Sequence, residues 1–307
     1  MDVKRRTFLL GTVSYAVVGC SPANQRSSTP PSLDTTAHPE PTPPASSVPS
    51  ATSDSAPSVE PDPTPSRSVG SDRTSRKALI RRYSGKRPNA WGETVPRVVR
   101  RLPTKDRVVA LTLDACGGRT GSGYDAKLIE LLRRERVPAT LFVNARWIEA
   151  NPRKLRRLAE DPLFEIANHG TAHRPLSVTG RSVYGISGTT SVADVVDEVT
   201  VNQRLLTKLT GVAPAFFRSG TAYYDDVAVR VVSDLGLRVV NFNVLGDAGA
   251  TYSASQVASA MLTSTSGSII LAHMNRPSRG TAEGIEAALP KLRKRGFRFV
   301  RLSEYLR

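Results

Sequence analysis

Short apolar strands alternate with helical stretches from about residue 105 onward, and this alternation limits the possible folds more than any other feature of the chain. Strands that are separated by helices pair in parallel, because each crossover returns the chain to the same side of the sheet. The segment is also long enough to bury one sizeable hydrophobic core. The predicted strands are residues 107–114, 138–144, 164–168, 215–218, 237–244, 268–273 and 297–300.

Polar side chains stand at or just past the C-terminal ends of six of these strands. In an open, doubly wound sheet such residues would be spread along one edge. A barrel gathers them around one mouth, where barrel enzymes carry their chemistry. The sequence therefore favours an α/β barrel of about seven parallel strands over an open sheet. The six residues are Asp114, Asn144, His169, Arg218, Asp247 and His273.

Residues 1–20 have the pattern of an export signal peptide. The run KRRTFLL resembles a twin-arginine signal, and the ending VVGC resembles a lipoprotein signal, in which Cys20 becomes the acylated first residue. The apolar stretch between them is too short to span a bilayer. We therefore expect an exported lipoprotein, anchored to the outer face of the cell membrane through Cys20. Secretion after cleavage of an ordinary signal is the alternative.

Residues 21–70 are predicted to be a disordered tether. Thirty of these fifty residues are Pro, Ser or Thr and none is aromatic, so the segment cannot bury enough apolar surface to offset the entropy of ordering. A basic lead-in, residues 71–104, follows. Residues 71–107 hold twelve Lys or Arg against three Asp or Glu, in a chain of net charge +16. An exported protein rarely meets nucleic acid, so we expect anionic wall polymers or plain solvation of the charge instead. The folded domain is predicted to be residues 105–307.

Three of the chain's four histidines end predicted strands. His169 and His173 lie in EIANHGTAH, and the H-x-x-x-H spacing lets two imidazoles turn toward one metal ion. Taken singly, Asp114 and Arg218 could equally be a helix cap and its structural ion-pair partner. The grouping of histidines with acid–base residues at strand ends predicts a metal site beside proton-transfer groups.

The order of these pieces resembles the polysaccharide deacetylase (NodB-homology) family of carbohydrate esterases. The matching stretches are VVALTLD, NHGTAH, FFRSG, GDAG and ILAH, in the family's order and spacing, over about residues 105–307. The resemblance implies a distorted (β/α) barrel of seven strands and a divalent metal ion, with zinc as the expected ion. It also implies removal of N- or O-acetyl groups from amino-sugar polymers such as peptidoglycan or chitin.

The resemblance also implies a role for each matched residue. A general base takes a proton from water, and a general acid supplies a proton to the leaving amine. His169 and His173 match the family's metal ligands. Four further residues match the family's catalytic residues. Asp114 matches the general base, and Arg218 matches the arginine that orients it. His273 matches the general acid, and Asp247 matches the aspartate of the fourth motif.

Two departures from the family pattern concern the metal and the substrate. The family usually has paired aspartates, the second of them a metal ligand, where this chain has Asp114-Ala115-Cys116. Asp114 itself, Cys116 as a thiolate, or Asp125 could supply the third ligand. We prefer Asp114, because cysteine more often fills a small buried space. The family's Arg-x-Pro-Tyr is replaced by RSGTAY, in which Tyr223 is the candidate substrate-binding residue.

Three functions fit these observations. The first is a metal-dependent hydrolase that deacetylates cell-wall glycan, acting as a monomer with a lipid anchor and without a nucleic-acid partner. The second is a degenerate barrel that binds glycan without cutting it, which loss of the usual third ligand would permit. The third is a protein that adheres to anionic polymer through residues 71–107. Retention of both Asp114 and His273 favours the hydrolase, since a glycan-binding protein needs neither.

Overall fold

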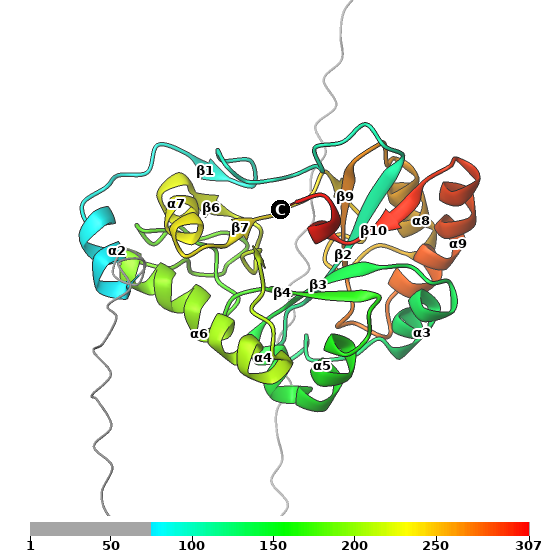
Figure 1. The fold of residues 1–307 in the computed structure, drawn as a ribbon, viewed down its shortest axis with the longest axis horizontal. Coiled ribbons are helices and arrows are strands. Elements are labelled where there is room, and N and C mark those ends of the chain that lie inside the picture. Colours follow the sequence, from blue (N-terminus) through cyan, green and yellow to red (C-terminus); the bar gives the residue numbers. More distant parts are fainter. Residues whose placement is uncertain (1–74, 307) are drawn as a thin grey trace, which may run out of the picture. The chain divides into compact units, whose positions relative to one another are not determined.

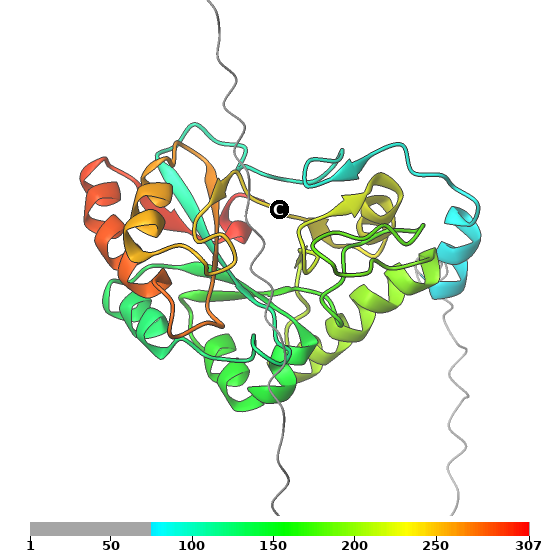
Figure 2. The same cartoon turned by 180° about the vertical axis from the view of Figure 1, so that it is seen from behind.

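The fold is a parallel sheet that curls into a half-barrel with helices on its outer side (Figure 1; Figure 2). The computed structural model describes residues 75–306. The strands of the main sheet are β2 (Val108–Ala115), β3 (Ala139–Val143), β4 (Phe164–Asn168), β5 (Phe216–Phe217), β7 (Arg238–Val239), β8 (Val244–Leu245), β9 (Ser268–His273) and β10 (Arg298–Val300). Seven of them follow the order β7-β5-β4-β3-β2-β9-β8, and β10 pairs with β2. All these pairings are parallel, so the predicted barrel of about seven parallel strands is confirmed.

β2 is the central strand, and all eight of its residues are buried. Its sequence VVALTLDA is the near-continuous apolar run that is typical of a parallel strand covered on both faces. β9 pairs along one edge of β2 and brings His273 level with Asp114. β10 and β3 share the other edge, opposite residues 108–110 and 112–115. Two predicted catalytic residues therefore lie side by side at the carboxyl ends of neighbouring strands.

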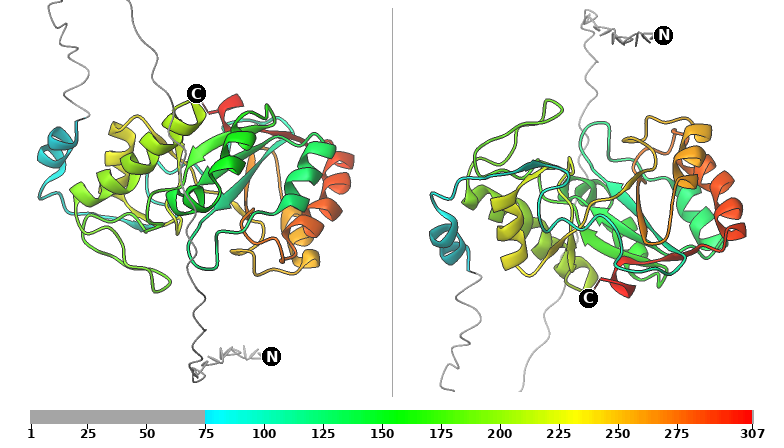
Figure 3. Two further views of the ribbon diagram at one scale, coloured as in Figure 1. Left: turned by 90° about the horizontal axis from the view of Figure 1, so that it is seen from below. Right: turned by 90° about the horizontal axis from the view of Figure 1, so that it is seen from above.

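The helices cover the outside of the curled sheet (Figure 3). One core cluster packs the sheet against helices near β2 and β3, and a second packs β5 and β7 against the helices at the other end of the sheet. A third cluster, which includes Phe142 and Phe216, fills the inside of the curl. The helices are α2 (Arg76–Tyr83), α3 (Ala126–Arg134), α4 (Ala145–Ala150), α5 (Pro152–Ala159), α6 (Val192–Thr210), α7 (Asp226–Asp234), α8 (Ala254–Leu262), α9 (Thr281–Lys294) and the short 3-10 helix η1 (Leu302–Glu304).

The basic lead-in is part of the folded unit, which therefore begins upstream of the predicted start near residue 105. Leu79 and Tyr83 of α2 are buried in the cluster that also contains residues of α6 and α7. β1 (Trp91–Gly92) pairs antiparallel with β6 (Tyr224–Asp225). The segment has many basic and few apolar residues, so its composition does not indicate that it folds. Some of its charges form ion pairs with the rest of the domain, as Arg76 does with Asp197.

The lead-in also bridges β7, at one end of the curled sheet, and β9, which is next to the other end. Val99 pairs with Val240, directly after β7, and Arg101 pairs with Ser268 of β9. The single strand predicted over residues 237–244 is divided into β7 and β8. Buried Asn241 interrupts it, because its backbone N–H donates to Val99 and its side chain donates to Glu93 and Ala222.

The predicted signal peptide, residues 1–20, and the predicted tether, residues 21–70, lie outside the described residues. Within residues 75–306, every helix falls short of the combination of length and apolar character that a membrane crossing requires.

Candidate active site

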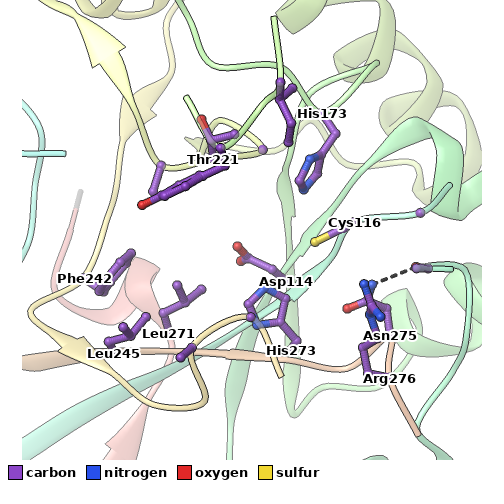
Figure 4. A pocket seen from close by; sticks show the side chains of 18 of the residues that line it. Asp114, Cys116, His173, Thr221, Phe242, Leu245, Leu271, His273, Asn275 and Arg276 are labelled. Atoms are coloured by element: carbon purple, nitrogen blue, oxygen red, sulfur yellow. Dashed lines mark hydrogen bonds between the residues drawn. The ribbon is translucent and has the colours of Figure 1, made fainter. Parts of the chain in front are cut away.

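A cavity of about 990 Å³ opens at the carboxyl ends of the central strands, and its lining includes Asp114, Cys116, His173 and His273 (Figure 4). Asp114 comes from β2 and Cys116 follows it, whereas His273 comes from β9. His173 lies in the loop after β4. The barrel geometry thus brings together residues that are far apart in the sequence, as the strand-end positions predicted.

Asp114 is held by a fully buried arginine. Arg218 donates to Asp114 Oδ1 over 2.7 Å and to the Thr112 hydroxyl and two backbone carbonyls with its remaining nitrogens. Its guanidinium also stacks over the Phe142 ring at 4.1 Å. Burial alone would raise the pKa of Asp114, but the charge of Arg218 holds it below the usual range. Asp114 is therefore a fixed carboxylate, with Oδ2 left to accept a proton.

His273 is paired with a second buried aspartate. Its Nδ1 lies 2.8 Å from Asp247 Oδ1, and its backbone N–H donates to Asp247 Oδ2 over 2.7 Å. The Thr281 hydroxyl also donates to Oδ2. Burial alone would lower the pKa of His273, but the charge and hydrogen bond of Asp247 raise it well above the usual value. The imidazole is therefore protonated near neutral pH and can act as a proton donor in the cavity that it lines.

His169 and His173 present ring nitrogens beside the sulfur of Cys116. His169 Nδ1 lies 3.0 Å from the Arg218 carbonyl, which is an acceptor and so fixes the proton on Nδ1 and the lone pair on Nε2. His173 Nε2 is buried without a hydrogen-bond partner. One ligand atom from each of these three residues lies within 4.8 Å of the others. The side chains present thus fit a divalent metal ion.

The charge state of these groups also suits a metal. Burial lowers the pKa of His169 despite the nearby Asp114 carboxylate, so its imidazole is neutral, as a ligand must be. Burial alone would raise the pKa of the Cys116 thiol, but the charges of His173 and His273 lower it to about 6. A thiolate is the form of cysteine that binds metals.

Asn144 and Glu198 hold the histidine loop in place. The sequence indicated Asn144 only by its position at the end of a strand, and it did not single out Glu198. Asn144 caps α4 and donates to the carbonyls of His169 and Gly170, each over 2.8 Å. Glu198 of α6 accepts backbone N–H bonds from the loop residues Thr171, Ala172 and Arg174. Glu198 is only 5% exposed. Its position three residues after the buried Val195, on the same side of the helix, was the signal in the sequence that Glu198 is buried.

Tyr223 is close to the cavity but does not line it. Its ring contacts those of Trp91, at 5.8 Å, and Tyr184, at 5.6 Å. The lining in this region comes from Gly220, Thr221 and Ala222, which precede it.

The comparisons with known proteins agree with this geometry. A sequence model of the polysaccharide deacetylase family matches residues 101–240. A peptidoglycan-N-acetylglucosamine deacetylase of Bacillus cereus is 25% identical over 210 residues, which are 67% of this chain and 91% of that protein.

Two solved structures share the fold. One is a pseudoenzyme of carbohydrate esterase family 4 (CE4) from Bacillus anthracis, with a TM-score of 0.59, 21% identity and coverage of 70% of each chain. The other is a family 4 acetyl xylan esterase from Clostridium thermocellum in complex with a cobalt ion. It has a TM-score of 0.53 and 24% identity, and it covers 64% of this chain and 89% of that one. Residues 101–240 therefore match the polysaccharide deacetylase family, and this match together with the curated relative indicates a hydrolase that acts on carbon–nitrogen bonds other than peptide bonds.

Proposed function

We propose that this protein is a metal-dependent hydrolase that removes acetyl groups from the amino sugars of a cell-wall polysaccharide such as peptidoglycan. The observation that carries the proposal is the pair formed by Asp114 and His273. They lie level on neighbouring strands and line one cavity, and opposite charges on Arg218 and Asp247 hold one deprotonated and the other protonated. Groups whose surroundings push their pKa values apart are the signature of a base and an acid in one site.

The reaction divides between these residues and a metal ion. His169 and His173 would hold the ion, with zinc as the proposed identity, and when bound it would polarise the acetyl carbonyl. Asp114 Oδ2 takes the proton of the attacking water, while Arg218 keeps the carboxylate oriented. His273 then gives its proton to the amine, which is a poor leaving group when unprotonated.

The rim of the cavity favours an anionic polymer. Arg100, Arg119, Arg146 and Arg276 contribute to the lining, against the single rim carboxylate Glu93. Burial raises the pKa of Glu93, and the charge of Arg100 opposes that shift. A cleft lined by one sign of charge concentrates ligands of the opposite sign. Cell-wall glycan that carries carboxylates or phosphates fits this rim.

A glycan-binding barrel without hydrolysis is the second candidate. It is supported by Ala115, which stands where the family has a ligand aspartate, and by the likeness to a CE4 pseudoenzyme. Metal-dependent release of acetate from peptidoglycan and from acetylated chitin fragments separates the two functions. We expect release that a chelator abolishes and that Asp114→Asn lowers strongly. Glu149→Gln, on an exposed part of α4, is the matched carboxylate control.

Absence of acetate release from these substrates with zinc, cobalt or nickel would refute the hydrolase. Retained glycan binding in the same samples would then support the second candidate.

We further propose that the protein is exported and held to the membrane by acylated Cys20, and that it acts as a monomer. The VVGC ending of the first twenty residues supports the anchor. The Pro/Ser/Thr-rich residues 21–70 would then let the domain reach polymer at a distance from the membrane.

A further inference from the structure

The end of β2 places alternate side chains on opposite faces. Asp114 and Cys116 line the cavity, whereas Ala115 is fully buried in the core cluster between the sheet and the helices. This alternation follows from the period of two along a strand. A carboxylate at position 115 would therefore enter the apolar core. The side chain that reaches the histidines from this stretch, besides Asp114, is that of Cys116.

The separations between the donor atoms suit one ion. Cys116 Sγ lies 3.8 Å from His169 Nε2. Atoms bound to one tetrahedral zinc ion at the usual bond lengths lie about 3.5 Å apart. One donor atom each from Cys116, His169 and His173 lies within 4.8 Å of the others. The largest separation, at most 4.8 Å, would have to close by about 1 Å to reach this value, which small rotations of two side chains can supply.

The two imidazoles are oriented for this role. The bond of His169 Nδ1 to the Arg218 carbonyl leaves its Nε2 facing the sulfur. His173 has a backbone φ of 63°, and its Nε2 is buried without a partner. Gly220 makes this position possible, since a Cβ there would lie 2.4 Å from His173 Cγ. An unpartnered buried nitrogen is costly unless a ligand satisfies it.

Each of the two other candidate ligands has one carboxylate oxygen engaged elsewhere. Asp114 Oδ1 is bound to Arg218, and Oδ2 is 3.5 Å from His169 Nε2. Within residues 75–306, the group of donor atoms that lie within 4.8 Å of one another consists of Cys116, His169 and His173, without Asp114. Asp125 caps α3 through Oδ1 and its backbone N–H donates to Met274. The geometry therefore favours Cys116 over the carboxylate that the sequence suggested.

We propose that Cys116 Sγ is the third protein ligand, so that this chain holds its metal through one sulfur and two imidazole nitrogens. This inference takes its site from the proposed function and extends it. A thiolate donor shifts the preference of the site toward zinc and cobalt and away from magnesium and calcium. It also leaves Asp114 to act only as the base.

Cobalt spectroscopy tests the ligand directly. The full chain with Cys20→Ser has Cys116 as its single cysteine, and it would be titrated with cobalt(II) after removal of metal with a chelator. We expect a near-ultraviolet thiolate-to-cobalt charge-transfer band that saturates at one cobalt per chain. In the same background, Cys116→Ser should remove the band. Cys116→Asp should bind cobalt through oxygen without it.

Affinity and thiol reactivity give independent readouts. Loss of an outer partner of a ligand costs about 10–100-fold in metal affinity, so Cys116→Ser should weaken zinc binding by at least that factor. Zinc should also slow the alkylation of Cys116 by iodoacetamide, and a chelator should restore the rate. Far-ultraviolet circular dichroism of each variant checks that the fold survives.

A cobalt complex of the parent that lacks the band, with one cobalt bound by equilibrium dialysis, would overturn the proposal. So would alkylation at the same rate with and without zinc. A band in a protein that releases no acetate would instead leave Cys116 as a ligand and refute only the hydrolase.

Discussion

Replacing Glu198 should loosen the loop that carries His173, although Glu198 lies outside the donor group. Its buried carboxylate accepts backbone N–H bonds from Thr171, Ala172 and Arg174, at 3.0–3.2 Å. Each buried donor left unsatisfied costs about 1–3 kcal/mol. The loop is partly exposed, so water can replace part of each bond. Glu198→Ala should therefore lower the free energy of unfolding by about 3 kcal/mol, the lower end for three donors.

Glu198→Gln tests how much of the stability depends on the charge of the side chain, because its shape is nearly unchanged. The amide oxygen can keep the bonds now made to Oε1, but the charge is lost and an NH₂ group replaces the acceptor Oε2. We expect a loss of about 1 kcal/mol. Urea unfolding followed by circular dichroism measures these changes, and calorimetric titration measures the zinc Kd. Glu149→Ala on exposed α4 is the control, with a change within about 0.5 kcal/mol.

Zinc affinity is the decisive readout, because Glu198 acts on the metal only through the loop. Glu198→Ala should weaken zinc binding about 10–100-fold, as removal of outer partners of metal ligands does. The reasoning is wrong if Glu198→Ala unfolds like Glu149→Ala. A destabilised variant with wild-type zinc affinity would show that this carboxylate does not position His173.

Four further changes test three parts of the site and the proposed lipid anchor. His273→Gln should lower turnover by about 10²–10⁴-fold with metal content unchanged, by elemental analysis. Asp247→Asn removes the charge that raises the pKa of His273, so the alkaline limb of the pH–rate profile should move to lower pH; an unmoved limb would mean that another group is the acid. Gly220→Ala should displace His173 and weaken zinc binding, because its Cβ would lie 2.4 Å from that ring; unchanged affinity would contradict the contact. Cys20→Ala should move the protein from the membrane pellet to the soluble fraction with domain activity intact, and persistence in the pellet would exclude the lipid anchor.

The sheet and the positions of its strand-end residues could be predicted because both depend on local pattern. The apolar run of β2 and the helical period of α6 each mark an element, and the polar residue that ends a strand marks the rim of the barrel. Asp114 and His273, which no local rule connects, came together because parallel strands share one carboxyl edge.

The rest depended on contacts between distant segments. α2 is too basic for its composition to indicate that Leu79 and Tyr83 are buried. Glu198 lies on the buried side of the helical pattern, but the loop to which it binds could not be inferred from that pattern. The position of Cys116 was partly readable, since residues two apart on a strand face the same side. Its distance from two histidines on another loop was not.

The pairing of β2 with β9 and β10 determines when the domain can complete its fold. Val108 pairs with Arg298, and Asp114 pairs with His273. A ribosome must therefore synthesise residues near 300 before both edges of this wholly buried strand can be covered. Such long-range parallel pairing forms slowly, and the uncovered strand is open to aggregation until it does. If the twin-arginine interpretation of residues 1–20 is correct, this vulnerable interval is passed in the cytoplasm, where chaperones can protect the chain before export.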